Sequence, residues 1–220
     1  MKRLFFDIET VLNPGVIDLM PEPAAPANLK DPEKITAAIE EKKREMIEKA
    51  ALDADYGRIL SIGYSSGDGD NVHVMVNEDV YPDCFLYNNS EEQMLKAFWN
   101  LFKECGGACV GYNILGFDLP YLMRRSMALG VKLPFIPNLA KYRTEPITDL
   151  MMIIYNWGSD KYKSLKQVAK LYGIENGAPE VGGSMVSGLD AEQLIAYQIS
   201  DVKLVMALYE KMNGVYFVHR

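Results

Sequence analysis

The sequence is poor in histidine and cysteine, and this scarcity excludes several kinds of active site. The two histidines, His73 and His219, rule out a multi-histidine metal site and leave a Ser-His-Asp triad without a convincing base. The three cysteines, Cys84, Cys105 and Cys109, are too few for a disulfide framework. Any chemistry must therefore depend on carboxylates.

Long apolar runs are also missing from the sequence. No stretch approaches the length of a membrane span, and Met1-Lys2-Arg3 leads straight into an apolar segment without room for a signal peptide. We therefore expect a cytoplasmic protein with no membrane partner. The length of 220 residues suits one α/β domain, and 49% hydrophobic residues suit a large core.

Positive charge is scarce overall but is concentrated in one region. The formal net charge of −7 disfavours a protein that holds nucleic acid by bulk electrostatic attraction. Residues 121–172, however, carry nine basic residues against three acidic ones, which leaves a local charge of +6. The basic residues are Arg124, Arg125, Lys132, Lys141, Arg143, Lys161, Lys163, Lys166 and Lys170. For any single lysine among them, we favour an ordinary solvated surface position.

An apolar segment near the N-terminus, residues 4–10, contains two carboxylates. Apolar residues crowd around Asp7 as in a strand that is covered on both faces, so we expect a central strand. Asp7 and Glu9 are two positions apart, so their side chains share a face. Unpaired charge there is costly, and we predict that the pair lies at the carboxyl end of the strand and holds divalent metal. Hydrogen bonding to loop amides is the alternative.

The last predicted helix carries a further carboxylate. Asp190-Ala191-Glu192-Gln193 is a capping box, and the helix should end at Asn213-Gly214. Apolar residues recur at steps of three and four, with Asp201 in the middle of their stripe and Tyr197 one turn earlier on the same face. Lys203 lies well round the helix, so Asp201 needs another partner. We favour metal over backbone amides.

A fourth acid follows a short buried strand at residues 108–112. Asp118 precedes Leu119-Pro120, and we predict that it occupies the N-cap of a helix with Pro120 in the first turn. Capping by itself would explain an isolated acid at this position. A capping carboxylate still has a free oxygen, so Asp118 can also complete a metal-binding set.

The remaining pattern indicates an α/β fold, a mixed β-sheet flanked by helices. Strands are expected at residues 58–64 and 72–76, joined by a hairpin turn at Gly67-Asp68-Gly69-Asp70. We expect a single domain over residues 1–220, interrupted at about 14–55 by a Pro-rich passage and a helix that begins with Asp31 as its N-cap.

These residues together resemble a known family. The sequence is similar to the DEDD superfamily of 3′–5′ exonucleases, tyrosine subtype, in three motifs: Phe6-Asp7-Ile8-Glu9-Thr10, Asn113-x-x-x-Phe117-Asp118-x-Pro120 and Tyr197-x-x-x-Asp201. The histidine subtype would have histidine where this chain has Ala196. Within the superfamily, the chain most resembles stand-alone relatives of the proofreading domain of family B DNA polymerases, from Leu4 to about Leu208.

The resemblance implies a ribonuclease-H-like fold and a hydrolase that removes nucleotides from the 3′ end of single-stranded nucleic acid, with DNA favoured over RNA. It implies that two Mg²⁺ or Mn²⁺ ions are held by Asp7, Glu9, Asp118 and Asp201. Tyr197 would orient the attacking water. The substrate would be contacted by Thr10, Asn113 and Phe117. The basic region would carry the rest of the strand, Asp149 would be structural, and a replication or repair partner would be expected.

Two other functions compete with this one. A haloacid-dehalogenase-like phosphatase begins with an Asp-x-Asp-x-Thr motif after an apolar strand, which Asp7-Ile8-Glu9-Thr10 nearly matches. That family needs a later lysine and an acidic pair, and it leaves Tyr197 and Asp201 unexplained. A non-catalytic module that binds single-stranded ends or recruits a replication complex is the second alternative, although such modules usually lose one of the acids.

Overall fold

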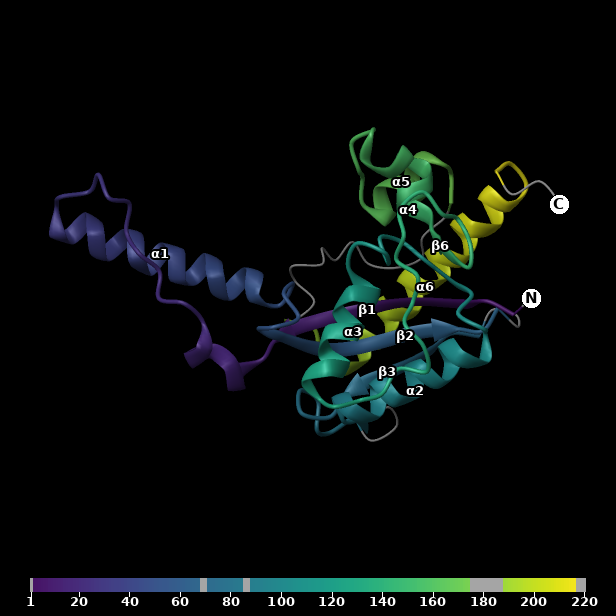
Figure 1. Ribbon diagram of the computed structural model, residues 1–220, viewed down its shortest axis with the longest axis horizontal. Coiled ribbons are helices and arrows are strands. Elements are labelled where there is room, and N and C mark those ends of the chain that lie inside the picture. The colour runs from purple at the N-terminus through teal and green to yellow at the C-terminus, as the bar shows by residue number, and fades with distance from the viewer. Residues whose placement is uncertain (1, 68–70, 85–87, 175–187, 217–220) are drawn as a thin grey trace.

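A computed structural model describes residues 2–67, 71–84, 88–174 and 188–216. Its centre is a six-stranded sheet in the order β4-β3-β2-β1-β5-β6. The strands are β1 (Leu4–Leu12), β2 (Gly57–Ser65), β3 (His73–Asn77), β4 (Asn88–Asn89), β5 (Cys109–Gly111) and β6 (Ile147–Asp149). The strand β1 is central, as predicted, and helices flank the sheet (Figure 1).

The sheet is mixed, which confirms the predicted fold class. The first three strands form antiparallel pairs, whereas β1, β5 and β6 run parallel. The predicted hairpin is present as the β2–β3 pair, although residues 68–70 of its turn lie outside the described residues. Parallel strands require crossover connections, and those from β1 to β5 and from β5 to β6 carry the helices Glu91–Glu104 and Asp118–Ala128.

The helix starts predicted at Asp31 and Asp190 are confirmed. The α-helices are α1 (Pro32–Ala50), α2 (Glu91–Glu104), α3 (Asp118–Ala128), α4 (Leu150–Ile154), α5 (Leu165–Leu171) and α6 (Ala191–Asn213), with 3₁₀ helices η1 (Pro14–Leu19) and η2 (Asn156–Gly158). The side chains of Asp31, Ser90, Ser164 and Asp190 each accept a hydrogen bond from a backbone amide of the first turn, as caps do. No helix in the described part of the chain has the length and apolar character needed to cross a membrane.

Alternation along β1 divides the core between the two faces of the sheet. Phe6 packs against Phe98 of α2, with ring centroids 4.9 Å apart, whereas Phe5 packs against Tyr209 of α6 at 5.4 Å. Odd-numbered residues of β1 therefore face α6. Asp7 and Glu9 continue this odd-numbered series, so the strand directs both carboxylates toward the last helix.

A glycine lets α6 approach the sheet closely. A Cβ atom on Gly63 of β2 would lie 2.5 Å from Cγ of Gln198 and 2.9 Å from Cγ2 of Val202, both on α6. Only the missing side chain allows this approach. The close packing brings the middle of α6 over the middle of β1, where the carboxylates lie.

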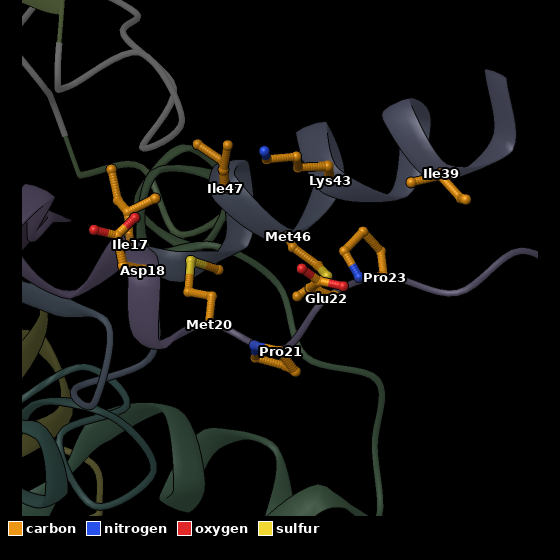
Figure 2. Close-up of a pocket in the computed structure, with 10 residues that line it drawn as sticks. All are labelled: Ile17, Asp18, Met20, Pro21, Glu22, Pro23, Ile39, Lys43, Met46 and Ile47. Carbon is orange, nitrogen blue, oxygen red and sulfur yellow. The ribbon is translucent and has the colours of Figure 1, made fainter. Parts of the chain in front are cut away.

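Residues 13–56 form an arm that extends away from the sheet (Figure 1). It leaves and returns at adjacent positions, because Leu12 and Gly57 are partners in the β1–β2 pair and the Asn13 amide donates to the Tyr56 carbonyl at 2.9 Å. A groove of about 500 Å³ runs between η1, the Pro-rich passage and α1. Figure 2 shows the apolar part of its lining, including Met20, Met46 and Ile47.

Candidate active site

Three carboxylates from opposite ends of the chain meet between β1 and α6. Asp7, Glu9 and Asp201 each offer an oxygen within 4.8 Å of the others. The prediction that Asp7 and Glu9 end their strand was wrong, because β1 continues to Leu12. Pairing with β2 extends the strand, and its register shifts between Glu9 and Thr10. Such an irregularity re-aims side chains near it, so the two acids lie beside a local distortion in the middle of the strand.

Asp118 joins this cluster through the backbone of β1, and its predicted capping role was wrong. The helix α3 begins at Asp118, and its N-cap is Phe117, which provides no side-chain cap. Asp118 Oδ1 instead accepts a hydrogen bond from the Ile8 amide at 3.2 Å. The pairing of β5 with β1 ends at Phe5, so the Ile8 amide is open to a side-chain acceptor. Asp118 is thereby fixed beside the residue that separates Asp7 from Glu9.

Mutual repulsion and burial favour the neutral forms of these acids. Burial, followed by the charge of Asp201, raises the pKa of Asp7 to about 7. Burial also raises the pKa values of Glu9 and Asp118, and in both cases the charge of Asp7 adds to the effect. A raised pKa means that the ionised group lacks compensation in the protein alone. Three converging acids, with Asp118 bonded to the same strand, therefore form a site that a cation would stabilise.

One lysine, which the sequence analysis did not connect with the site, partly offsets this charge. Lys166 of α5 places its ammonium 3.9 Å from Asp201 Oδ1 and 4.1 Å from the centre of the Tyr197 ring. Tyr197 also shares a hydrogen bond with Asp201. Burial and the charges of Glu9 and Asp201 raise the Tyr197 pKa, so its hydroxyl stays protonated and can donate or accept a hydrogen bond at neutral pH.

Gln198, likewise unassigned by the sequence analysis, holds Asp7 in place. Its side-chain amide donates to Asp7 Oδ2 at 2.7 Å and to the Asp7 carbonyl at 3.3 Å, and its oxygen accepts from the Ser61 hydroxyl. Gln198 is fully buried. Since Gln198 is itself held by Ser61 and binds both the side chain and the backbone of Asp7, it positions one carboxylate of the cluster.

The donor set suits a hard divalent cation. All four candidate ligands are carboxylates, which Mg²⁺ and Mn²⁺ prefer. Asp201 Oδ1 is buried and has no hydrogen-bond partner among the described residues, although Lys166 lies at ion-pair distance. A buried oxygen without a hydrogen bond, facing further carboxylates, is the feature that a metal ligand shows when its ion is absent. The residues therefore fit the metal that the sequence predicts.

The expected substrate contacts lie on β1 and on the loop that leads to Asp118. Thr10 and Phe117 both adjoin Tyr121: Thr10 shares a hydrogen bond with its hydroxyl, and the Phe117 ring lies 5.3 Å from the Tyr121 ring. Asn113, in a left-handed conformation with φ of 68°, begins the same loop as Phe117, and its carbonyl accepts a hydrogen bond from the Phe117 amide at 2.9 Å. The buried Asp149 accepts hydrogen bonds from the amides of Asn113 and Leu115 at 3.0 and 2.9 Å, which fixes the loop that leads to Asp118.

Besides Lys166, two further cations of the basic region are paired with acids from elsewhere in the chain. Arg125 forms a buried pair with Glu91 at 2.8 Å, and Arg124 pairs with Asp53 and Asp55 at the base of the arm. The expectation that the whole region faces a nucleic acid strand therefore needs correction at these two positions. The sequence shows where the basic residues lie, but it does not show which acidic residue of a distant segment pairs with each of them.

Comparisons with known proteins agree with this geometry. Residues 52–214 match a family described as predicted 3′–5′ exonucleases related to the exonuclease domain of PolB. The chain is 29% identical over 99 residues to a DNA polymerase from Pyrococcus glycovorans, a match that covers 44% of this chain and 12% of that protein. Its fold is similar to the family B DNA polymerase from Pyrobaculum calidifontis, with a TM-score of 0.60, 20% identity, and coverage of 96% of this chain and 24% of that one.

The family match begins at Leu52, near the end of the arm, so the strand β1 lies before the matched residues. Asp7 and Glu9 lie outside the matched residues, but β1 pairs along its length with β2, which lies inside them. The arm separates β1 from the matched sequence, whereas the sheet unites the two. Since the match covers more than half of the chain, the protein belongs to the family of predicted 3′–5′ exonucleases related to the exonuclease domain of PolB.

Proposed function

We propose that the protein is a 3′–5′ exonuclease that removes nucleotides from single-stranded nucleic acid, with DNA favoured over RNA. The observation that carries the proposal is the convergence of Asp7, Glu9 and Asp201 within 4.8 Å, with Asp118 bonded to the intervening backbone. The family and the likeness to DNA polymerases support the substrate class. The chain spans a small part of those polymerases, so polymerisation is not part of the proposal.

The four acids would hold two Mg²⁺ or Mn²⁺ ions. When bound, such a pair activates a water molecule and stabilises the leaving 3′-oxygen of the displaced nucleotide. Gln198 keeps one Asp7 oxygen occupied and so leaves its other oxygen for the ions. Tyr197, held by Asp201 and covered by Lys166, would orient the attacking water through its protonated hydroxyl.

The terminal nucleotide would lie toward Tyr121, where Thr10 and Phe117 meet. Phe117 is half-buried, so part of its ring is open for stacking or wedging against a base. Asn113 would contact the same nucleotide from its loop.

Degradation of a 5′-labelled single strand in Mg²⁺ tests the proposal directly. We expect a ladder of products that shortens with time, because the label stays on the retained end. Matched DNA and RNA strands show which sugar is preferred. Immediate release of labelled mononucleotide would indicate the opposite polarity. Hydrolysis of p-nitrophenyl phosphate without strand degradation would indicate a phosphatase, and strand binding without degradation a non-catalytic module.

Replacement of Tyr197 by phenylalanine should slow hydrolysis by about tenfold to a hundredfold, because the water loses one orienting group while the ions remain. The ring under Lys166 is retained, so the packing of α5 on α6 should not change. Single-turnover rates measure the effect. Tyr81→Phe is the matched control, because its hydroxyl donates to the Leu189 carbonyl. An unchanged rate in Tyr197→Phe would remove this hydroxyl from the mechanism.

We further propose that the protein is one domain and that the arm is an insertion at about residues 14–55. The adjacent positions of Leu12 and Gly57 support this, because the arm leaves and rejoins neighbouring strands at one edge. We propose that the arm meets a replication or repair partner.

Replacement of residues 15–49 by a short Gly-Ser linker should leave a folded exonuclease, since Ala50 and Ala54, which are buried, and the partners of Arg124 remain. We expect the melting temperature to fall by only a few degrees, about the effect of 1 kcal/mol for a chain of this size. Differential scanning calorimetry and the strand assay measure both properties. A variant that does not fold would show that the arm belongs to the domain's core.

A further inference from the structure

A second cavity lies on the far side of the loop that carries the Asn113 motif. Its volume is about 130 Å³, and it lies between that loop, α4, η2 and the segment around Lys141. The walls include Leu115, Gly116, Lys141, Met152, Trp157 and Tyr162. In Figure 1 this region is the group of green elements around α4 and α5. Nothing in the mechanism above uses this cavity.

The cavity shares a wall with the candidate active site. Leu115 and Gly116 line it, and the same loop continues through Phe117 to Asp118. Asp149 holds the loop by accepting hydrogen bonds from the amides of Asn113 and Leu115. It also accepts from the Met152 amide at 3.2 Å, which connects α4 to the same carboxylate. A strand whose 3′ end reaches Asp118 therefore has the cavity close to its path.

Two aromatic side chains, Trp157 and Tyr162, line the cavity, and a third, Tyr142, contacts Trp157. The rings of Tyr142 and Trp157 lie 5.4 Å apart and are tilted by 55°, and Tyr142 is 74% exposed. Tyr162 is 40% exposed, and its hydroxyl contacts the Met152 sulfur at 3.3 Å. Exposed aromatic surface next to a cavity is available to stack on a planar ligand.

The backbone that presents these rings is held in an unfavourable conformation. Tyr142, Asn156 and Trp157 have φ values of 64°, 46° and 56°, in the left-handed region that residues other than glycine seldom adopt. Such conformations cost free energy, and they cluster where function requires a particular presentation. Here they accompany the ring contact between Tyr142 and Trp157, of which Trp157 lines the cavity.

The volume of the cavity and the charged residues around it indicate which kind of ligand would fit. A volume of 130 Å³ is well below the roughly 300–1,000 Å³ of sites that enclose a whole cofactor, so it suits one ring system of a larger molecule. Lys141 forms part of the wall, and Arg143, Lys161 and Lys163 are exposed on the same segments, with Asp160 as the acid among them. This local excess of positive charge, in a chain of net charge −7, is complementary to phosphates.

We propose that this cavity, called here the Trp157 pocket, receives a base of the single-stranded substrate upstream of the 3′-terminal nucleotide. The base stacks on Trp157 and Tyr162, while Lys141 contacts an adjacent phosphate. The proposal rests on the proposed function, because it assigns a second subsite to the same strand. The pocket would keep the strand bound as successive nucleotides are removed, and it would not affect the bond-breaking step.

Tryptophan fluorescence tests the proposal, because the chain has two tryptophans in contrasting places. Trp99 is 2% exposed and donates to the Ser126 hydroxyl at 2.8 Å, deep in the core, whereas Trp157 borders the pocket. The probe is an oligothymidylate of about eight nucleotides, within the usual site sizes for single strands, with phosphorothioate linkages that resist cleavage. We expect it to quench the wild type and Trp99→Phe, but not Trp157→Phe. Quenching that persists in Trp157→Phe, or that is absent from Trp99→Phe, would overturn the proposal.

Kinetics separate this proposal from the proposed function. Trp157→Ala should raise the KM for an oligonucleotide about 5- to 100-fold with little change in kcat, the fold-change expected from loss of one base–aromatic stack. Hydrolysis of the p-nitrophenyl ester of thymidine 5′-monophosphate, which is too short to reach the pocket, should not change. Equal effects on both substrates, or no effect on the oligonucleotide, would refute the pocket. Failure of the wild type to cleave either would refute the exonuclease instead.

Discussion

Asp201→Asn should lose strand hydrolysis by about a thousandfold or more, which corresponds to about 4 kcal/mol of transition-state stabilisation. Asparagine keeps the shape of the side chain but removes the negative charge that Asp201 adds to those of Asp7 and Glu9 in the cluster. With one acid neutral, the site loses the negative charge that would hold a pair of divalent ions. Asp7→Asn should have an effect of the same size, because Asp7 contributes to the same group of oxygens.

Glu210→Gln is the matched control for this loss. It makes the same chemical change on the same helix, but Glu210 is exposed and lies beyond the cluster. Its rate should equal that of the wild type. Circular dichroism and thermal melting should show that all three variants are folded, since burial raises the pKa of Asp201 and its charge does not favour folding of the metal-free protein. Wild-type turnover by Asp201→Asn would contradict the assigned site.

Divalent cations should stabilise the protein strongly at pH 8 and much less at pH 5. The pKa of Asp7 is raised from its ordinary value of 3.8 to about 7, so the folded protein holds this proton more tightly than the unfolded chain does. The stability that protonation provides is complete below about pH 4 and is lost as the pH rises through about 7. The metal-free protein should therefore melt at a lower temperature at pH 8 than at pH 5.

Mg²⁺ or Mn²⁺ should reverse this loss at pH 8, where the acids are ionised and can act as ligands. At a hundred times its dissociation constant, an ion that binds only the folded state adds about 2.7 kcal/mol, or about 5–10 °C for a chain of this size. Sodium chloride at matched ionic strength controls for screening. Asp201→Asn should show a much smaller shift. The prediction would be contradicted if Mg²⁺ and Mn²⁺ left the melting temperature of the wild type unchanged. It would also be contradicted if that temperature rose with pH in the absence of these ions.

Local sequence rules account for much of the fold. The caps at Asp31, Ser90, Ser164 and Asp190 depend only on a side chain and the amides two or three residues later, so the sequence contains all the necessary information. The central position of β1 follows from its nearly continuous apolar composition. Asp7 and Glu9 are two residues apart in a strand, and Tyr197 and Asp201 are four residues apart in a helix. Each pair must therefore share a face of its own element.

The same rules failed where two distant segments compete for one group. Asp118 was expected to cap its helix, but the Ile8 amide of β1 takes its carboxylate, and no local pattern contains that donor. Lys166 was counted as surface charge, because only the packing of α5 on α6 brings it to Asp201. Gln198 could have been found, since it lies three residues before Asp201 on the buried side of the helix. Its partner Asp7 could not, because it lies 191 residues away.

The sequence by itself determined which acids can act together and which element carries each of them, because side-chain direction follows from the period of a strand or helix. Only the tertiary structure decided that they meet. The missing side chain of Gly63 lets α6 lie close to the sheet, and the alternation of β1 aims Asp7 and Glu9 at that helix. Distances between segments depend on packing among residues that are far apart in the chain, and no local pattern encodes that packing.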